Sequence, residues 1–215
     1  LEGLGDSRHE TARKQACKLR RVNGVAFAAS GPIGYRTTAI VNKPDYELMD
    51  IAEKILRTDG PLKARLDRLD GTFAPIFDFA INDHRRPRGL LVPQVDKLIE
   101  MFFVARRAGR VEVGTRAYLP QPGPGRTSVA VYGRDCVLPA CEIKIAAFGG
   151  TIEAMDAALP TVRRSLTLPL KAQRLIEAQI AATPRNVGPP VDVVSATRAG
   201  GVTWFARKDG CLADQ

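Results

Sequence analysis

Histidine, cysteine and tryptophan are scarce in this chain of 215 residues, and their scarcity excludes several kinds of site. The two histidines have no second ligand at metal-binding spacing, and no two of the four cysteines have the two-residue spacing of a zinc knuckle. The sequence also lacks GxSxG, P-loop, HExxH and strand-linked GxGxxG motifs. We therefore expect no zinc site and no non-haem iron site. We also expect that protein side chains alone bind no metal ion of any kind.

Long apolar runs are absent as well. No run approaches the roughly 18–20 residues needed to cross a membrane, and the first ten residues lack the apolar core of a signal peptide. Apolar residues make up 45% of the chain and charged residues 26%, which is typical of a globular domain with a real core. We expect a soluble, cytoplasmic protein with no membrane contact, in which reduced cysteines are the default and disulfides are the alternative.

Basic residues outnumber acidic ones, 32 against 23, which gives a net charge of +9. This excess favours acidic partners such as nucleic acid, an anionic cofactor or an acidic protein. The basic clusters lie within residues 13–21, 85–88 and 106–110, and only the first lies wholly on a predicted helix. A solvated basic face is the alternative, so nucleic-acid binding is possible but not favoured.

Hydrophobic periodicity and turn residues divide the chain into helices and strands. The predicted helices span residues 7–21, 44–58, 62–70, 94–108 and 166–183, and a further one begins at residue 152. The predicted strands span residues 22–29, 35–41, 111–119, 128–132, 141–148, 191–197 and 202–207. Residues 71–81 are apolar, but Pro75 argues against a central strand there.

These elements favour an α+β fold with a largely antiparallel sheet flanked by helices. We predict one domain over residues 1–215, with a helical insertion at about 42–110.

The segment from Cys141 to Gly210 carries an ordered set of motifs. The first part consists of a strand, Gly149-Gly150-Thr151 and a helix. The second part begins with Leu166-Thr167-Leu168, which opens a second helix that contains Leu175-Ile176. A strand, the Gly200-Gly201 turn and a last strand that ends in Phe205-Ala206-Arg207-Lys208-Asp209-Gly210 follow. This set resembles the GlcG/HbpS-like family, which includes the C-terminal domain of PduO. The piece that closes the family domain here precedes the piece that opens it, so the order is permuted or fragmentary. The resemblance implies an antiparallel sheet flanked by helices.

Two places in this segment are candidate ligand sites. Gly149 and Gly150 let the backbone approach a ligand, and the helix start at Thr151 offers free N–H groups to an anion; a plain capped turn is the alternative. Arg207 and Asp209 at the end of the hairpin could line a ligand mouth, or form an ordinary charged turn. We predict these five residues to bind a cofactor.

The simplest interpretation of the two histidines, His9 and His84, is that both are surface residues. Because some members of the resembled family bind haem or corrinoid, the resemblance makes an axial haem ligand the functional reading of His9. We therefore predict a homo-oligomeric small-ligand or cofactor-binding protein that holds haem or another anionic tetrapyrrole. An enzyme acting on a small acidic substrate, with Asp209 or Glu153 as base, and a nucleic-acid-binding protein are the alternatives.

The permuted order makes a topological prediction. The strand at Ile143–Phe148 should share a sheet with the hairpin strands at 191–197 and 202–207. Trp204 should lie on the same face of its strand as Val202, because side chains alternate along a strand.

Overall fold

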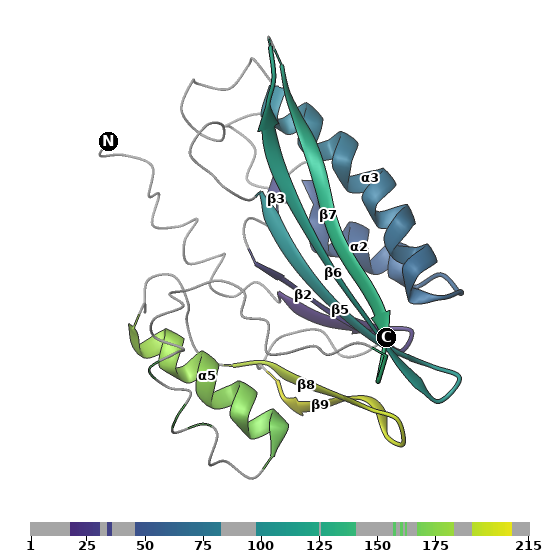
Figure 1. Cartoon of the computed structure of the whole chain (residues 1–215), viewed down its shortest axis with the longest axis vertical. Coiled ribbons are helices and arrows are strands. Elements are labelled where there is room, and N and C mark those ends of the chain that lie inside the picture. Colours follow the sequence, from purple (N-terminus) through teal and green to yellow (C-terminus); the bar gives the residue numbers. More distant parts are fainter. Residues whose placement is uncertain are drawn as a thin grey trace. The chain divides into compact units, whose positions relative to one another are not determined.

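The structure is a computed structural model of the chain. The described residues are 18–30, 34–35, 46–82, 98–124, 126–140, 157, 160, 162, 167–182 and 191–207. The chain divides into two compact units, one made of Leu19–Phe148 with Ala196–Val202 and the other of Leu1–Lys18, Gly149–Ser195 and Thr203–Gln215. The predicted class, α+β with an antiparallel sheet flanked by helices, is confirmed (Figure 1). The single domain over the whole chain stays a prediction.

A five-stranded antiparallel sheet dominates the larger unit. Its strands, in spatial order, are β1 (Leu19–Val22), β2 (Val25–Ser30), β5 (Ile99–Arg107), β6 (Arg110–Pro122) and β7 (Thr127–Val137). A separate two-residue ladder joins β3 (Gly34–Tyr35) to β4 (Tyr46–Glu47). The long strands β5, β6 and β7 form a meander, so neighbours in the sheet are also neighbours in the sequence.

Two tight turns connect neighbouring strands of this sheet. Asn23 and Gly24 join β1 to β2 with φ values of 42° and 72°, and Ala108 and Gly109 join β5 to β6 with φ values of 49° and 72°. Positive φ at both central residues is what a type I′ hairpin requires, and Asn-Gly is its most favoured sequence. The predicted strand over residues 22–29 therefore starts later, as β2, and Val22 belongs to β1.

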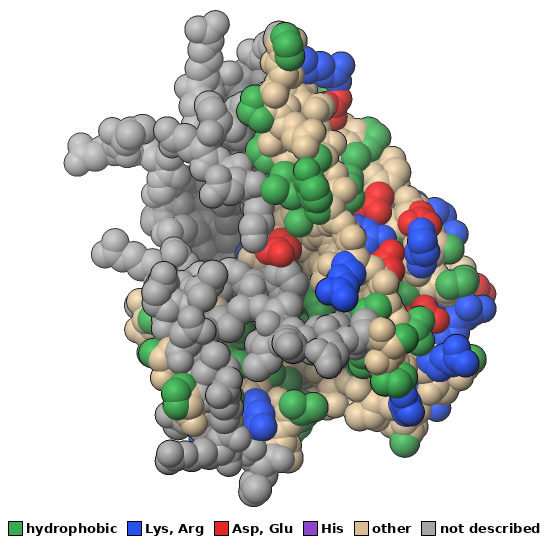
Figure 2. All heavy atoms as spheres, in the orientation of Figure 1, with side chains coloured by type: hydrophobic (Ala, Val, Ile, Leu, Met, Phe, Trp, Pro, Cys, Tyr) green, Lys and Arg blue, Asp and Glu red, His purple; other side chains and the backbone are tan. Residues whose placement is uncertain are grey.

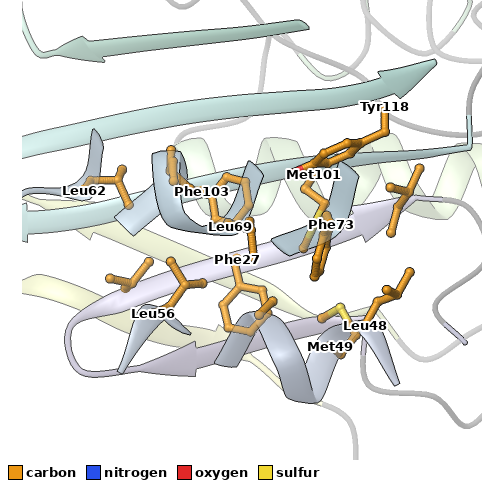
Figure 3. Packing of buried hydrophobic residues seen from close by; sticks show 14 of the residues in the cluster. Phe27, Leu48, Met49, Leu56, Leu62, Leu69, Phe73, Met101, Phe103 and Tyr118 are labelled. Carbon is orange, nitrogen blue, oxygen red and sulfur yellow. The ribbon is translucent and has the colours of Figure 1, made fainter. Parts of the chain in front are cut away.

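Helices α2 (Leu48–Leu56) and α3 (Leu62–Asn82) cover one face of the sheet (Figure 1). The core between them is apolar and nearly free of solvent (Figure 3). Its largest fully buried side chains are Tyr118, Phe27, Phe73, Phe103, Leu48, Met49, Leu56, Leu66, Leu69, Ile99 and Met101. Each of these side chains stabilises the fold by about 1.5–3 kcal/mol relative to an exposed position.

Helix α3 is longer than the predicted helix over residues 62–70. It continues through residues 71–81 with Pro75 inside it. Pro75 removes one i to i−4 hydrogen bond, but Phe73 and Phe77 fall on the buried stripe that begins with Leu66 and Leu69. Burial of these aromatic rings outweighs the local cost of the proline.

The predicted helix over residues 94–108 is wrong, because residues 99–107 form strand β5. Ile99, Met101 and Phe103 are buried and the residues between them are half-buried, which is the two-residue period of a strand. The same segment also contains apolar residues at helical spacing. Pairing with β2 and β6 on both sides decides between the two patterns.

The C-terminal elements agree with the sequence-based prediction. Helix α5 spans Leu168–Ala182, and strands β8 (Val193–Thr197) and β9 (Gly201–Ala206) form a two-stranded sheet. The Thr197 hydroxyl accepts a hydrogen bond from the Gly200 N–H at 2.8 Å and so closes the turn. Val202 is buried, Thr203 exposed and Trp204 half-buried, which confirms the predicted alternation.

The strand predicted at Ile143–Phe148 lies outside the described residues, so its sheet stays a prediction. Among the residues that the structure does describe, no helix is long and apolar enough to span a membrane.

Candidate functional site

Helix α3 lies along β6 with matched spacing, and this match places the polar groups of the larger unit. The Leu62 N–H donates to Glu112 Oε2 at 2.7 Å, and Asp70 Oδ2 accepts from Arg116 Nε at 2.7 Å. Four residues of helix rise about 6 Å and two residues of strand about 6.6 Å, so contacts recur along both elements. Gly114 lies between Glu112 and Arg116, and its missing side chain leaves the space that Leu66 fills.

Arg116 is the most buried charged residue at the contact between α3 and β6, with 3% of its surface exposed. Its guanidinium donates to both oxygens of Asp135, at 2.6 and 2.9 Å, in addition to Asp70. Nη1 also donates to the Thr115 carbonyl oxygen at 2.7 Å. The Tyr118 hydroxyl donates to the remaining Asp70 oxygen, Oδ1, at 2.7 Å. We call Asp70, Arg116, Tyr118 and Asp135 the Arg116 cluster.

The protonation states of two cluster members, Arg116 and Tyr118, are fixed by their surroundings. Burial disfavours the charged form of Arg116, but its hydrogen bonds to Asp135 and Asp70 outweigh burial, so the pKa of Arg116 is raised. Burial also raises the pKa of the Tyr118 hydroxyl, and the nearby charge of Asp70 raises it further. Arg116 therefore stays charged and Tyr118 stays neutral across the physiological range.

These contacts make the Arg116 cluster a structural device and not a ligand site. The bidentate pairing with Asp135 and the bond to Asp70 commit the guanidinium to its own carboxylates. Neither tyrosine nor arginine can act as a general base when its pKa is raised. The cluster ties α3 to β6 and β7.

Basic side chains of the larger unit are interspersed with acidic ones, as Figure 2 shows for one face. The predicted basic helix over residues 7–21 is wrong at its end, because Leu19–Val22 form β1; residues 7–17 lie outside the described part. Arg20 bonds to Asp50 at 2.6 Å and to Glu53 at 3.0 Å. This guanidinium is engaged with carboxylates, which weakens the nucleic-acid alternative.

The end of β9 holds the one predicted site residue that the structure describes, Arg207. Its guanidinium carbon lies 5.0 Å from the centre of the Trp204 ring, within the range of a cation–π contact. Trp204 and Arg207 are half-buried, whereas Phe205 between them points to the other side and is 50% exposed. Sequence reasoning named Arg207 but missed Trp204, although the only tryptophan of the chain stands three residues before it.

The placement of the other predicted site residues stays a prediction. Gly149, Gly150, Thr151, Asp209 and His9 lie outside the described residues. Within the described part, no group of three or more His, Cys, Asp or Glu side chains could hold a metal ion.

Cys136 departs from the expectation of reduced thiols. It is the one cysteine among the described residues, and it is disulfide-bonded. The other cysteines, Cys17, Cys141 and Cys211, lie outside the described residues. The expectation is therefore wrong at this position.

Comparisons with protein-family models, with curated proteins and with solved structures find no match for this chain.

Proposed function

We propose that this chain binds a small anionic ligand at the end of the β8–β9 hairpin, with Arg207 as its anchor. The observation that supports the proposal is the placement of the Arg207 guanidinium over the Trp204 ring. The ring limits the positions that the long arginine side chain can take, so less side-chain entropy is lost when an anion binds. A held guanidinium can bind a carboxylate or phosphate through two parallel hydrogen bonds.

The proposed ligand class is an anionic tetrapyrrole such as haem, in the manner of the GlcG/HbpS-like family. Arg207 and Trp204 suit the rim of such a molecule, since a guanidinium pairs with propionate carboxylates and an indole packs against a flat apolar ring. When bound, haem would supply its iron as the binding or redox centre. Its ligation by His9, and the contribution of Gly149, Gly150, Thr151 and Asp209, remain parts of the proposal that sequence alone supports.

Trp204 provides a direct assay, because it is the only tryptophan of the chain. Haemin titrated into the protein should shift its Soret band and quench Trp204 fluorescence with one common saturation curve. Protoporphyrin IX, which lacks iron, separates the contribution of the iron from that of the rim contacts. If Arg207 and Trp204 hold the rim of the tetrapyrrole, protoporphyrin IX should bind with an affinity within about tenfold of that of haemin, a difference of about 1.4 kcal/mol.

Arg207→Met tests the anchor, and Arg198→Met is the matched control. Arg198 is an exposed arginine in the turn of the same hairpin. Loss of a charge-assisted contact of about 1.5–3 kcal/mol weakens binding by about 10–150-fold in Arg207→Met, whereas Arg198→Met should bind as the wild type does. No Soret shift in the wild type would refute haem binding, and equal affinities of the two variants would refute the role of Arg207.

The cytoplasmic location also stays a prediction, and the disulfide at Cys136 argues against it. Disulfides persist mainly in oxidising compartments, since the cytosol keeps thiols reduced. Thiol titration of the denatured protein, with and without prior reduction, measures this directly. Four reactive thiols before reduction would favour the cytoplasm, and fewer would favour an oxidising compartment.

A further inference from the structure

Strand β7 is an edge of the five-stranded sheet in the part of the chain that the structure describes, with β6 as its one ladder partner. The register between β6 and β7 runs without interruption from Pro122↔Thr127 to Glu112↔Val137. Antiparallel strands direct the backbone groups of alternate residues to opposite edges. Half of the backbone groups of β7 therefore point away from β6.

Hydrogen bonds at both ends of β7 identify which half this is. Gly123 N–H donates to the Arg126 carbonyl at 3.1 Å, and Leu138 N–H donates to the Val111 carbonyl at 2.9 Å, so even-numbered residues face β6. The amide of Asn82 bonds to both the N–H and the C=O of Thr127, at 3.2 and 2.7 Å, from the outer side. Odd-numbered residues thus carry the outward groups.

Among the residues that the structure describes, the outward edge has partners at its two ends and none between them. Asn82 occupies the backbone groups of Thr127, and the Ala140 N–H occupies the Val137 carbonyl at 2.9 Å. The residues between them that direct N–H and C=O groups outward are Val129, Val131, Gly133 and Asp135. A row of outward backbone groups is a template for pairing with another strand.

This open stretch is complementary to itself. In an antiparallel pair of two β7 strands centred on Tyr132, Val129 stands opposite Asp135 and Val131 opposite Gly133, so every open group finds a partner. The same register sets the closed residue Thr127 opposite the closed residue Val137. A shift by two residues in either direction would oppose an open residue to a closed one.

Tyr132 strengthens the choice of this register. Its side chain is 57% exposed, on the sheet face opposite α3, because the neighbouring Gly133 faces the Arg116 side chain. At the centre of the pair the two Tyr132 residues form a non-hydrogen-bonded pair, with Cα atoms about 4.5 Å apart. Two exposed aromatic rings would then cover each other, a contact worth about 0.5–1.5 kcal/mol beyond burial.

We propose that two copies of this chain associate through the β7 edges, with the two-fold axis at Tyr132, into one continuous antiparallel sheet. This interface gives the predicted homo-oligomer a defined geometry. It does not depend on the proposed ligand, because Arg207 and Trp204 belong to the other unit.

Sedimentation equilibrium of the full chain over a dilution series tests the dimer. Tyr132→Lys places two like charges opposite each other and should raise the dimer dissociation constant at least about tenfold. Val131→Pro removes an outward N–H that β6 does not use, so it should have the same effect; circular dichroism checks that it folds, and Tyr132→Lys decides if it does not. The control is Phe79→Lys, at an exposed aromatic of α3, which should leave the dimer unchanged.

Crosslinking tests the register. Tyr132→Cys should form a disulfide between two copies under mild oxidation, whereas Ala130→Cys, two residues away on the same face, should not, because Ala130 faces Arg134 of the second copy. A wild type that stays monomeric, or a dimer that both Tyr132→Lys and Val131→Pro leave intact, would overturn the proposal. Efficient crosslinking through Ala130→Cys alone would overturn this register.

Discussion

Replacement of Arg116 by methionine isolates the Arg116 cluster, because methionine keeps much of the side-chain volume and removes the charge. Arg116 donates three hydrogen bonds to Asp70 and Asp135 and one to the Thr115 carbonyl. Breaking a buried ion pair on one side costs about 3–5 kcal/mol, since the remaining charge loses its partner. The side chains of Asp70 and Asp135 are 23% and 24% exposed, so water can reach both carboxylates. We therefore expect a loss near the low end, about 3 kcal/mol.

Urea unfolding followed by far-ultraviolet circular dichroism measures this loss as a shift of the midpoint at constant slope. Arg110→Met is the control: Arg110 is an exposed arginine at the start of β6, and its replacement should change the free energy of unfolding by no more than about 0.5 kcal/mol. A third variant, Arg116→Met with Asp70→Asn and Asp135→Asn, removes the unpaired charges and should recover at least half of the loss. A loss below about 1 kcal/mol in the single variant, or no recovery in the triple variant, would refute the reasoning.

Three further stability predictions concern the same unit. A Cβ at Gly114 would lie 2.3 Å from Leu66 Cδ1, so Gly114→Ala should lower the free energy of unfolding by about 1–3 kcal/mol, and Leu66→Ala should cost less in that background than in the wild type. Glu112→Ala should cost about 1 kcal/mol in urea unfolding, because the Glu112 carboxylate caps the first N–H of α3 at Leu62. Burial and then the charge of Asp50 raise the pKa of Glu47 above 4.5, so the folded state holds this proton more tightly and stability falls as pH rises through that range. Glu47→Gln should therefore gain stability over the wild type at pH 7 and lose that advantage near pH 4, and an equal gain at both pH values would contradict this cause.

The sequence predicted the elements whose local and tertiary preferences agree. The helix at 168–182 and the hairpin of β8 and β9 combine regular periodicity, a proline in the first turn and a Gly-Gly turn, and all of them appear in the structure. The predicted helix over residues 44–58 is confirmed over Leu48–Leu56, where its apolar residues lie on one buried face, but its predicted start is wrong, because Tyr46–Glu47 form strand β4.

The failures occurred where two patterns compete within one segment. Residues 94–108 contain apolar residues at helical spacing and also at every second position from Ile99, and only pairing with β2 and β6 favours the strand. Pro75 argued correctly against a strand over residues 71–81, but the predicted helix ended at residue 70, whereas burial of Phe73 and Phe77 extends it through Pro75 to Asn82. The Asn23-Gly24 turn was a readable signal that was missed.

The candidate site was harder to predict than the fold because no sequence pattern indicates which of its residues contact one another. Arg207 was named from its place after a strand, yet its contact with Trp204 depends on the geometry of the strand end. The Arg116 cluster gave no sequence signal, since Asp70 and Asp135 stand far from Arg116 in the chain and meet it only when α3 docks on the sheet.

The contrast between Arg116 and Arg207 separates folding from binding. Arg116 forms ion pairs with Asp70 and Asp135, and all three residues belong to the larger unit. Arg207 lies over the ring of Trp204, and both of these residues belong to the smaller unit. Arg116→Met should therefore lower stability by about 3 kcal/mol and leave haemin affinity within about twofold of the wild type, under conditions where both proteins are folded. Arg207→Met should do the reverse: it should weaken haemin binding by about 10–150-fold and lower stability by no more than about 1 kcal/mol, the usual value of an accessible cation–π contact. Urea unfolding and haemin titration of the same two preparations give all four values. If Arg116→Met weakened haemin binding as much as Arg207→Met did, the anchor role would not belong to Arg207. Haemin binding would then depend on the larger unit, which contains the five-stranded sheet.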